Sequence, residues 1–106
     1  MDKFEERQKA FEKKFEHDQD MLFRILSRRA RLAGLWAAEH LGLKGEEAEA
    51  YAREIVQVDL DEPGHQDIVR RLRADFDGKA VDISNHRIEK ELERLLDVAT
   101  QQVKSA

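Results

Sequence analysis

Side chains that could bind a metal or transfer a proton are present in this chain, but their spacing does not form a known site. The four histidines are scattered, at positions 17, 40, 65 and 86, and none belongs to a His-Glu-x-x-His or comparable motif. Glu16 and Asp20 would share one face of a helix, but His17 and Asp18 would turn away from that face. We therefore favour a solvated helix surface here over a metal site.

Nucleophiles and phosphate-binding loops are equally hard to find. The serines at 27, 84 and 105 have no glycine-rich elbow and no neighbouring base. Residues 42–45 (GLKG) lack the preceding strand and the spacing of a phosphate loop. We expect no catalytic residue, no metal and no cofactor, with ADP or ATP binding only as a weak surface event. The protein is not expected to be an enzyme.

A seam of three phenylalanines in a highly charged segment has more functional character. Phe4, Phe11 and Phe15 recur at i, i+7 and i+11, which places them on one narrow face of a helix, and twelve of the first 20 residues are charged. Such a segment is a marginal helix alone and can become ordered in a groove of a partner. The phenylalanines would anchor it and the charges would fix its register. The alternatives are an arm folded back on its own domain, or self-association through the seam.

The elements that position this seam are helical throughout. Residues 2–41 contain no proline and only one glycine, Gly34, so the pattern predicts a single helix that ends at Leu41-Gly42. A second helix begins after Lys44-Gly45 and stops before Pro63-Gly64. A third spans residues 65–76, and Ser84 caps a fourth. Val81 and Ile83 between them are expected to close the end of the core. The prediction is an all-α four-helix bundle.

The lengths of these helices predict an overhang. If the first two helices form an antiparallel hairpin, Trp36 faces Tyr51 in the core and Arg28 faces Asp59. A 40-residue helix is about 60 Å long, and the other helices cover only about half of that length. Residues 1–20 should therefore project as an arm, and residues 21–106 should form the bundle domain. Below, "the arm" and "the bundle" denote these two ranges.

Composition narrows the class of partner. Charged residues make up 40% of the chain and the net charge is −4, so nucleic acid is not the expected partner. The basic residues 21–41 (net +3) are followed by the acidic residues 42–62 (net −5), which suggests internal pairing. With no cysteine, no signal peptide and no long apolar run, we expect a soluble cytoplasmic protein without membrane insertion, monomeric when free.

Several segments resemble one known family in order and spacing. They are residues 9–18 (KAFEKKFEHD), 34–43 (GLWAAEHLGL), 50–52 (AYA), 61–64 (DEPG) and 71–76 (RLRADF). Together they are similar to the zeta subunit of the alphaproteobacterial F-type ATP synthase, an intrinsic ATPase inhibitor family. The likeness covers nearly the whole chain. Residues 23–27 (FRILS) are more apolar than the family pattern, and Lys44 stands where a small capping residue is expected.

The resemblance implies a regulator whose N-terminal helix enters the catalytic head between the alpha, beta and gamma subunits and blocks rotation in the direction of ATP hydrolysis. The protein would then be attached peripherally to the inner membrane through the ATP synthase. The inhibitory stretch corresponds to residues 2–18. The candidate partner-binding residues are Asp2, Lys3, Phe4, Arg7, Phe11, Lys14, Phe15, His17 and Asp18. The alternative is a helical module that senses adenine nucleotides through basic residues of the bundle without direct inhibition.

Overall fold

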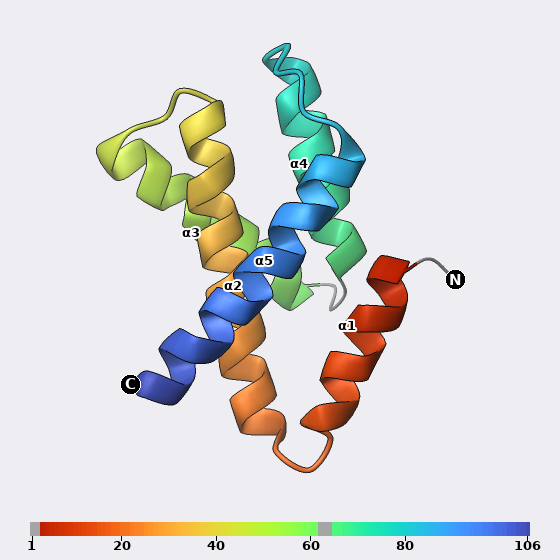
Figure 1. The fold of residues 1–106 in the computed structure, drawn as a ribbon. Coiled ribbons are helices and arrows are strands. Elements are labelled where there is room, and N and C mark those ends of the chain that lie inside the picture. Colours follow the sequence, from red (N-terminus) through yellow and green to blue (C-terminus); the bar gives the residue numbers. More distant parts are fainter. Residues whose placement is uncertain (1–2, 62–64) are drawn as a thin grey trace.

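The computed structural model describes residues 3–61 and 65–106, and within these ranges the chain is helical and contains no strand (Figure 1). Its helices are α1 (Lys3–Lys14), α2 (Gln19–His40), α3 (Gly45–Asp61), α4 (His65–Gly78) and α5 (Asn85–Ser105). The all-α prediction is confirmed, and α2 to α5 correspond to the four predicted helices. The predicted stop at Pro63-Gly64 lies outside the described residues.

The prediction of one helix over residues 2–41 is wrong, because the chain breaks between α1 and α2. The Asp18 side chain caps α2 by accepting a hydrogen bond from the Met21 backbone nitrogen at 3.0 Å. The Gln19 amide donates to the carbonyl oxygens of Phe15 and Glu16, at 3.3 and 3.1 Å. These bonds satisfy backbone groups that a helix end leaves open, so the break needs neither proline nor glycine.

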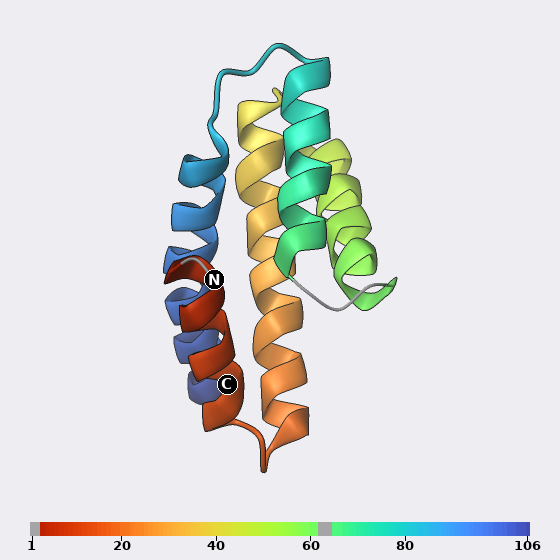
Figure 2. The ribbon, with the colours of Figure 1, turned by 90° about the vertical axis from the view of Figure 1, so that its right-hand side faces the viewer.

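The predicted overhang is wrong for the same reason. The loop after α1 reverses the chain, so that α1 runs back along the molecule with α5 beside it (Figure 2). The longest extent of the molecule is 41 Å, shorter than a straight 40-residue helix of about 60 Å. Phe4, expected on a free arm, is only 7% exposed. The arm is thus folded back on the bundle, the alternative left open above.

The core is built around α2, which packs closely on both α3 and α5. At Gly34 the backbones approach so closely that an added Cβ would lie 2.7 Å from the Ala52 Cα. This contact confirms the antiparallel hairpin of α2 and α3. The fully buried large side chains of the core are Ile25, Ile55, Ile68, Leu72, Phe76, Ile88 and Leu92, together with Arg29.

The predicted helix ends outside the arm are largely confirmed. Gly42 follows α2 with φ +78°, where a side chain would be strained. Ser84 accepts a hydrogen bond from the Arg87 backbone nitrogen at 3.1 Å and caps α5. Ile83 is 6% exposed and Val81 packs against the core, so both close its end as expected.

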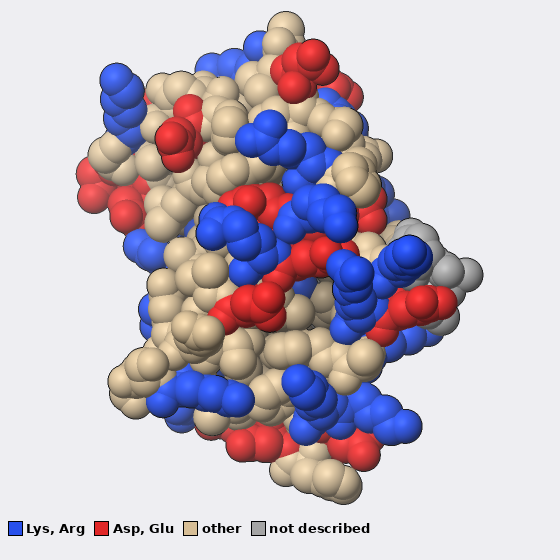
Figure 3. Space-filling model, in the orientation of Figure 1, with Lys and Arg blue, Asp and Glu red and all other residues tan. Residues whose placement is uncertain are grey.

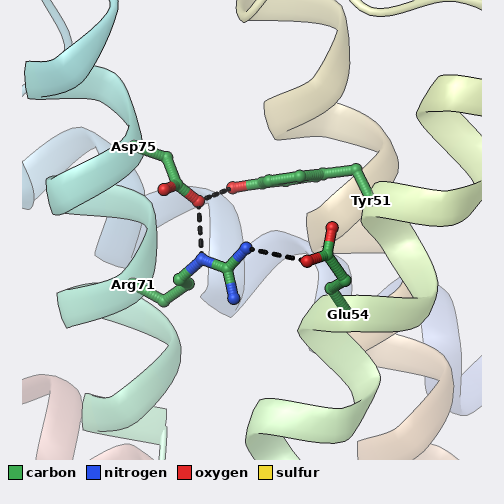
Figure 4. A network of polar contacts seen from close by, with 4 residues as sticks. All are labelled: Tyr51, Glu54, Arg71 and Asp75. Carbon is green, nitrogen blue, oxygen red and sulfur yellow. Dashed lines mark hydrogen bonds and ion pairs between the residues drawn. The ribbon is translucent and has the colours of Figure 1, made fainter.

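A polar network joins α3 to α4 at the buried face of Tyr51 (Figure 4). The Tyr51 hydroxyl donates to Asp75 Oδ2 at 2.5 Å, and Arg71 Nε donates to the same oxygen at 2.7 Å. The Arg71 guanidinium also lies over the Tyr51 ring, 5.6 Å from its centroid. Burial, followed by the hydrogen bond and the charge of Asp75, raises the pKa of Tyr51.

Replacement of this hydroxyl is expected to weaken the bundle. Tyr51→Phe should lower the free energy of unfolding by about 1–2 kcal/mol, because it removes a hydrogen bond to a charged group. Since folding raises the pKa of Tyr51, the stabilisation is present below about pH 10 and is lost as the pH rises above it. Urea unfolding at pH 7 and above pH 10 measures both effects, and Tyr51 is the only tyrosine. An equal alkaline loss in the variant would contradict this assignment.

Candidate functional site

The inner face of α1 is the part of the arm that contacts the bundle. Of its residues, Phe4 and Gln8 are buried, one helical turn apart. Phe11 and Phe15 continue the same stripe and pack, half-buried, against a small cluster on α2 and α5. The phenylalanine seam predicted from the sequence is therefore one continuous face, with Gln8 as an additional member.

Phe4 occupies the end of the main core, where α4 begins. Its ring meets the His65 ring edge to face, with centroids 4.4 Å apart and planes at 89°. His65 is itself 9% exposed. An edge-to-face pair of this kind contributes about 0.5–1.5 kcal/mol beyond the burial of apolar area. This contact is the main apolar anchor of the arm on the bundle.

Gln8 supplies a polar anchor by accepting a hydrogen bond from a buried arginine. The distance between Arg29 Nη1 and Gln8 Oε1 is 2.7 Å, and Arg29 is 1% exposed. Burial lowers the pKa of Arg29, while the charges of Asp59 and Glu12 oppose that shift. In the described part of the chain, no group accepts a hydrogen bond from Arg29 Nε. The folded-back arm thus buries the Arg29 guanidinium and accepts a hydrogen bond from Nη1, but among its described residues it offers no acceptor to Nε.

Exposed polar contacts between α1 and the bundle help to fix the position of the arm. Arg7 Nη1 lies 2.7 Å from Glu93 Oε2 on α5, and the Arg7 side chain is 60% exposed. The Gln66 amide of α4 donates to the Glu5 carboxylate. Solvent-exposed pairs contribute about 0.2–1 kcal/mol each, so they guide the arm more than they hold it.

The remaining predicted site residues lie towards the loop. The Phe11 and Phe15 rings are 5.0 Å apart, and the Lys104 ammonium lies 5.8 Å from the Phe15 centroid. Lys14 lines a groove between α1 and α5 together with Phe11 and Arg7. These candidate residues of the arm thus lie near each other while the arm is folded back on the bundle.

Three other candidates are exposed. Lys3 is exposed, and the His17 side chain is 96% exposed, 3.5 Å from the Glu16 carboxylate. Asp18 serves as the cap of α2. Asp2 lies outside the described residues.

Sequence reasoning missed the groups of the bundle that receive the arm, chiefly Arg29 and His65. A signal for Arg29 existed, because positions 25, 29, 33 and 37 are one turn apart and the other three are apolar. The prediction that Arg28 faces Asp59 is wrong by one residue: the charge of Asp59 acts on Arg29, and Arg28 donates to the Gln102 side chain at 3.2 Å. Internal charge pairing is nevertheless present, since Arg31 meets Glu49 at 2.8 Å.

The groove between the arm and the bundle is a poor site for a nucleotide. It has a volume of about 410 Å³ and its charged lining residues are Lys9 and Arg29 against Glu5, Glu12 and Asp59. The excess of carboxylates disfavours phosphate groups. The described residues contain no group of three or more potential metal ligands, and no helix among them is long and apolar enough to cross a membrane.

Comparison with known proteins identifies a family and related solved structures. The family described as ATPase inhibitor subunit zeta matches residues 1–102 of this chain. A protein whose structure was determined by solution NMR shares 41% sequence identity, with a TM-score of 0.71, over 80% of this chain and 96% of its own. No curated protein matches this chain in sequence.

Proposed function

Because this chain belongs to the ATPase inhibitor subunit zeta family, we propose that its arm is the element that inhibits the F-type ATP synthase. Membership implies inhibition of the ATP synthase by an inhibitor subunit, and not an enzymatic activity. In the proposed mechanism the arm enters the catalytic head between the alpha, beta and gamma subunits and blocks rotation in the direction of ATP hydrolysis. The protein would act on the cytoplasmic side of the inner membrane.

The observation that carries the proposal is the weak attachment of α1. Of its 12 residues two are buried, whereas α2 buries eight of 22. α1 also packs less closely on the other helices than α2 packs on α3 and α5. Burial of Phe4 contributes about 1.5–3 kcal/mol, and the Gln8–Arg29 hydrogen bond and the half-buried Phe11 and Phe15 add to it. Elements of this kind open at a small fraction of the global stability.

The loop between α1 and α2 has a sequence that can become helical when the arm leaves the bundle. Residues 15–18 contain neither proline nor glycine, so helical geometry is open to them once the Asp18 cap and the Gln19 bonds break. The arm and α2 would then form the long helix that the sequence pattern favours. Its Phe4, Phe11 and Phe15 seam, withdrawn from the bundle, would be free to bind the catalytic head.

Substitution of the half-buried Phe11 and Phe15 tests whether the phenylalanine seam is the inhibitory face. The double variant Phe11→Ala, Phe15→Ala is expected to raise the half-inhibitory concentration against ATP hydrolysis by the cognate ATP synthase about fivefold to tenfold. The gain from easier release partly offsets the loss of anchors, which keeps the expected change moderate. A steady-state hydrolysis assay measures it, with circular dichroism to confirm that the bundle is folded.

The matched control changes the opposite face of the same helix. Glu6→Ala with Lys13→Ala alters two exposed residues of opposite charge, leaves the net charge unchanged and retains helix propensity. This variant is expected to inhibit within about twofold of the parent protein. Equal loss of inhibition in both variants, or in neither, would refute the seam as the inhibitory face.

A further inference from the structure

Two exposed apolar side chains lie on neighbouring helices: Phe23 in the second turn of α2, and Leu60 near the end of α3. Phe23 is 56% exposed and Leu60 is 44% exposed, and they are the exposed large apolar residues of the described part of the chain. Both line the groove between the arm and the bundle, as does Leu26. Single exposed apolar residues are ordinary, whereas neighbouring ones beside a groove mark a binding surface.

A second groove borders Phe23 on its other side. It has a volume of about 570 Å³, and Val56 and Val103 form apolar parts of its lining. Its charged side chains are Arg24, Arg28 and Arg31, and no Asp or Glu side chain lines it. We refer to Phe23 with these three arginines as the Phe23 surface. The groove thus combines the arginines with apolar side chains, and Ser27 and Ala106 complete its lining.

The positive charge of this surface is only partly neutralised. Arg24 pairs with Asp20 at 3.0 Å and Arg31 with Glu49 at 2.8 Å, both in exposed positions. Arg28, in the described part of the chain, donates instead to the neutral side chain of Gln102. By contrast, acidic and basic groups are mixed over the face that α5 crosses (Figure 3). The surface therefore stands out from a chain whose net charge is −4.

We propose that the Phe23 surface is a second docking site, which binds an acidic segment of the ATP synthase head bearing an apolar anchor residue. The proposal rests on the proposed function, because the surface lies close to the loop from which the arm would leave the bundle. Once the arm is inserted, this part of α2 must lie at the entrance of the site that holds it. An acidic partner segment matches the arginines, and its apolar residue matches Val56, Val103 and Phe23.

The arm and the Phe23 surface would bind the same ATP synthase, so that each contact strengthens the other. After the arm is bound, the Phe23 surface meets its segment as an intramolecular event at high effective concentration, so even a weak contact lowers the concentration needed for inhibition. The arginines add long-range attraction, which accelerates encounter and weakens with salt. An exposed aromatic side chain with a basic rim has the composition common at the centre of such interfaces.

Two full-length variants test this site, with the cognate ATP synthase as the partner. Arg28→Glu is expected to raise the half-inhibitory concentration about fivefold to tenfold at low ionic strength and to flatten its dependence on salt. Phe23→Ala is expected to raise it about fivefold without changing the salt dependence. Arg87→Glu, a charge reversal at an exposed position of α5, is the matched control and should change it less than twofold.

The outcomes separate this inference from the proposed function. If Arg28→Glu and Phe23→Ala both inhibit like the parent protein while Phe11→Ala, Phe15→Ala is impaired, the second site is refuted and the arm assignment stands. If the arm variant also inhibits normally, both proposals fail. Loss of a dimer in sedimentation on Phe23→Ala would assign the surface to a second copy of this chain and overturn the proposal.

Discussion

A cross-link that holds the arm on the bundle is expected to abolish inhibition of ATP hydrolysis, and its cleavage is expected to restore inhibition. Arg7 and Glu93 meet at 2.7 Å across the two parts, and the chain contains no cysteine. Arg7→Cys with Glu93→Cys therefore introduces the only two thiols. A short bismaleimide with an internal disulfide would join them and could later be cut by a reductant. Loss of the exposed ion pair itself costs little, about 0.2–1 kcal/mol.

The physical reason is that the proposed inhibitory face and the folded-back face are the same. Phe4 is buried against His65 and the main core, and Phe11 and Phe15 rest on the bundle. A locked arm cannot present these side chains to the catalytic head. Because the competent fraction falls to nearly zero, the apparent affinity falls with it. Hydrolysis assays on the locked, cut and unmodified forms measure the effect.

A second cross-link within the bundle controls for the chemistry. Glu54→Cys with Arg71→Cys joins α3 to α4, whose side chains meet at 3.5 Å, and leaves both the arm and the Phe23 surface unchanged. This form is expected to inhibit like the uncross-linked protein. Full inhibition by the protein locked between 7 and 93 would show that the arm need not leave the bundle, and would contradict the proposed mechanism.

Helix positions and the central hairpin were predictable because strong local signals and tertiary packing agree there. Gly42 and Ser84 mark helix ends through backbone geometry and capping, which depend on one residue each. The pairing of α2 with α3 follows from their apolar stripes, and Gly34 lies at the closest approach. In these places the sequence offers one low-energy arrangement.

No proline or glycine marks the break at residues 15–18, so helix-breaking residues could not predict it. Asp18 is an effective cap, and a cap contributes about 0.5–2 kcal/mol, which is comparable to the loss of the helical bonds that it interrupts. The balance is decided by contacts distant in sequence, such as Phe4 with His65 and Gln8 with Arg29. A pattern of residues cannot show which of two nearly equal arrangements these contacts favour.

The sequence predicted which residues of the arm form the candidate site, but not which residues of the bundle they contact. The seam of Phe4, Phe11 and Phe15 is one face in the structure, as their spacing indicated. Its partner within the molecule was missed because it includes a buried arginine, which sequence patterns place at the surface. The same α2 segment thus carries Arg29 inward and Arg28 outward, a difference that helical periodicity describes but composition does not.

Charge reversal at these two adjacent arginines is expected to change inhibition in opposite directions. Arg29→Glu would place a carboxylate under the folded-back arm, close to Asp59 and Glu12, whose charges already act on this position. Burial of an unpaired charge costs about 3–5 kcal/mol, and release of the arm exposes the side chain to water and removes most of this cost. The variant should therefore favour the released arm.

The expected result is an about tenfold to hundredfold lower half-inhibitory concentration for Arg29→Glu, limited by the fraction of folded-back arm in the parent protein. Hydrogen exchange should show faster exchange of the α1 amides with continued protection of the buried core of α2 and α5. Arg28→Glu, one residue away and exposed, has the same change in charge but is expected to inhibit less well. If the α1 amides exchange faster in Arg29→Glu and inhibition is nevertheless unchanged, release of the arm does not limit inhibition.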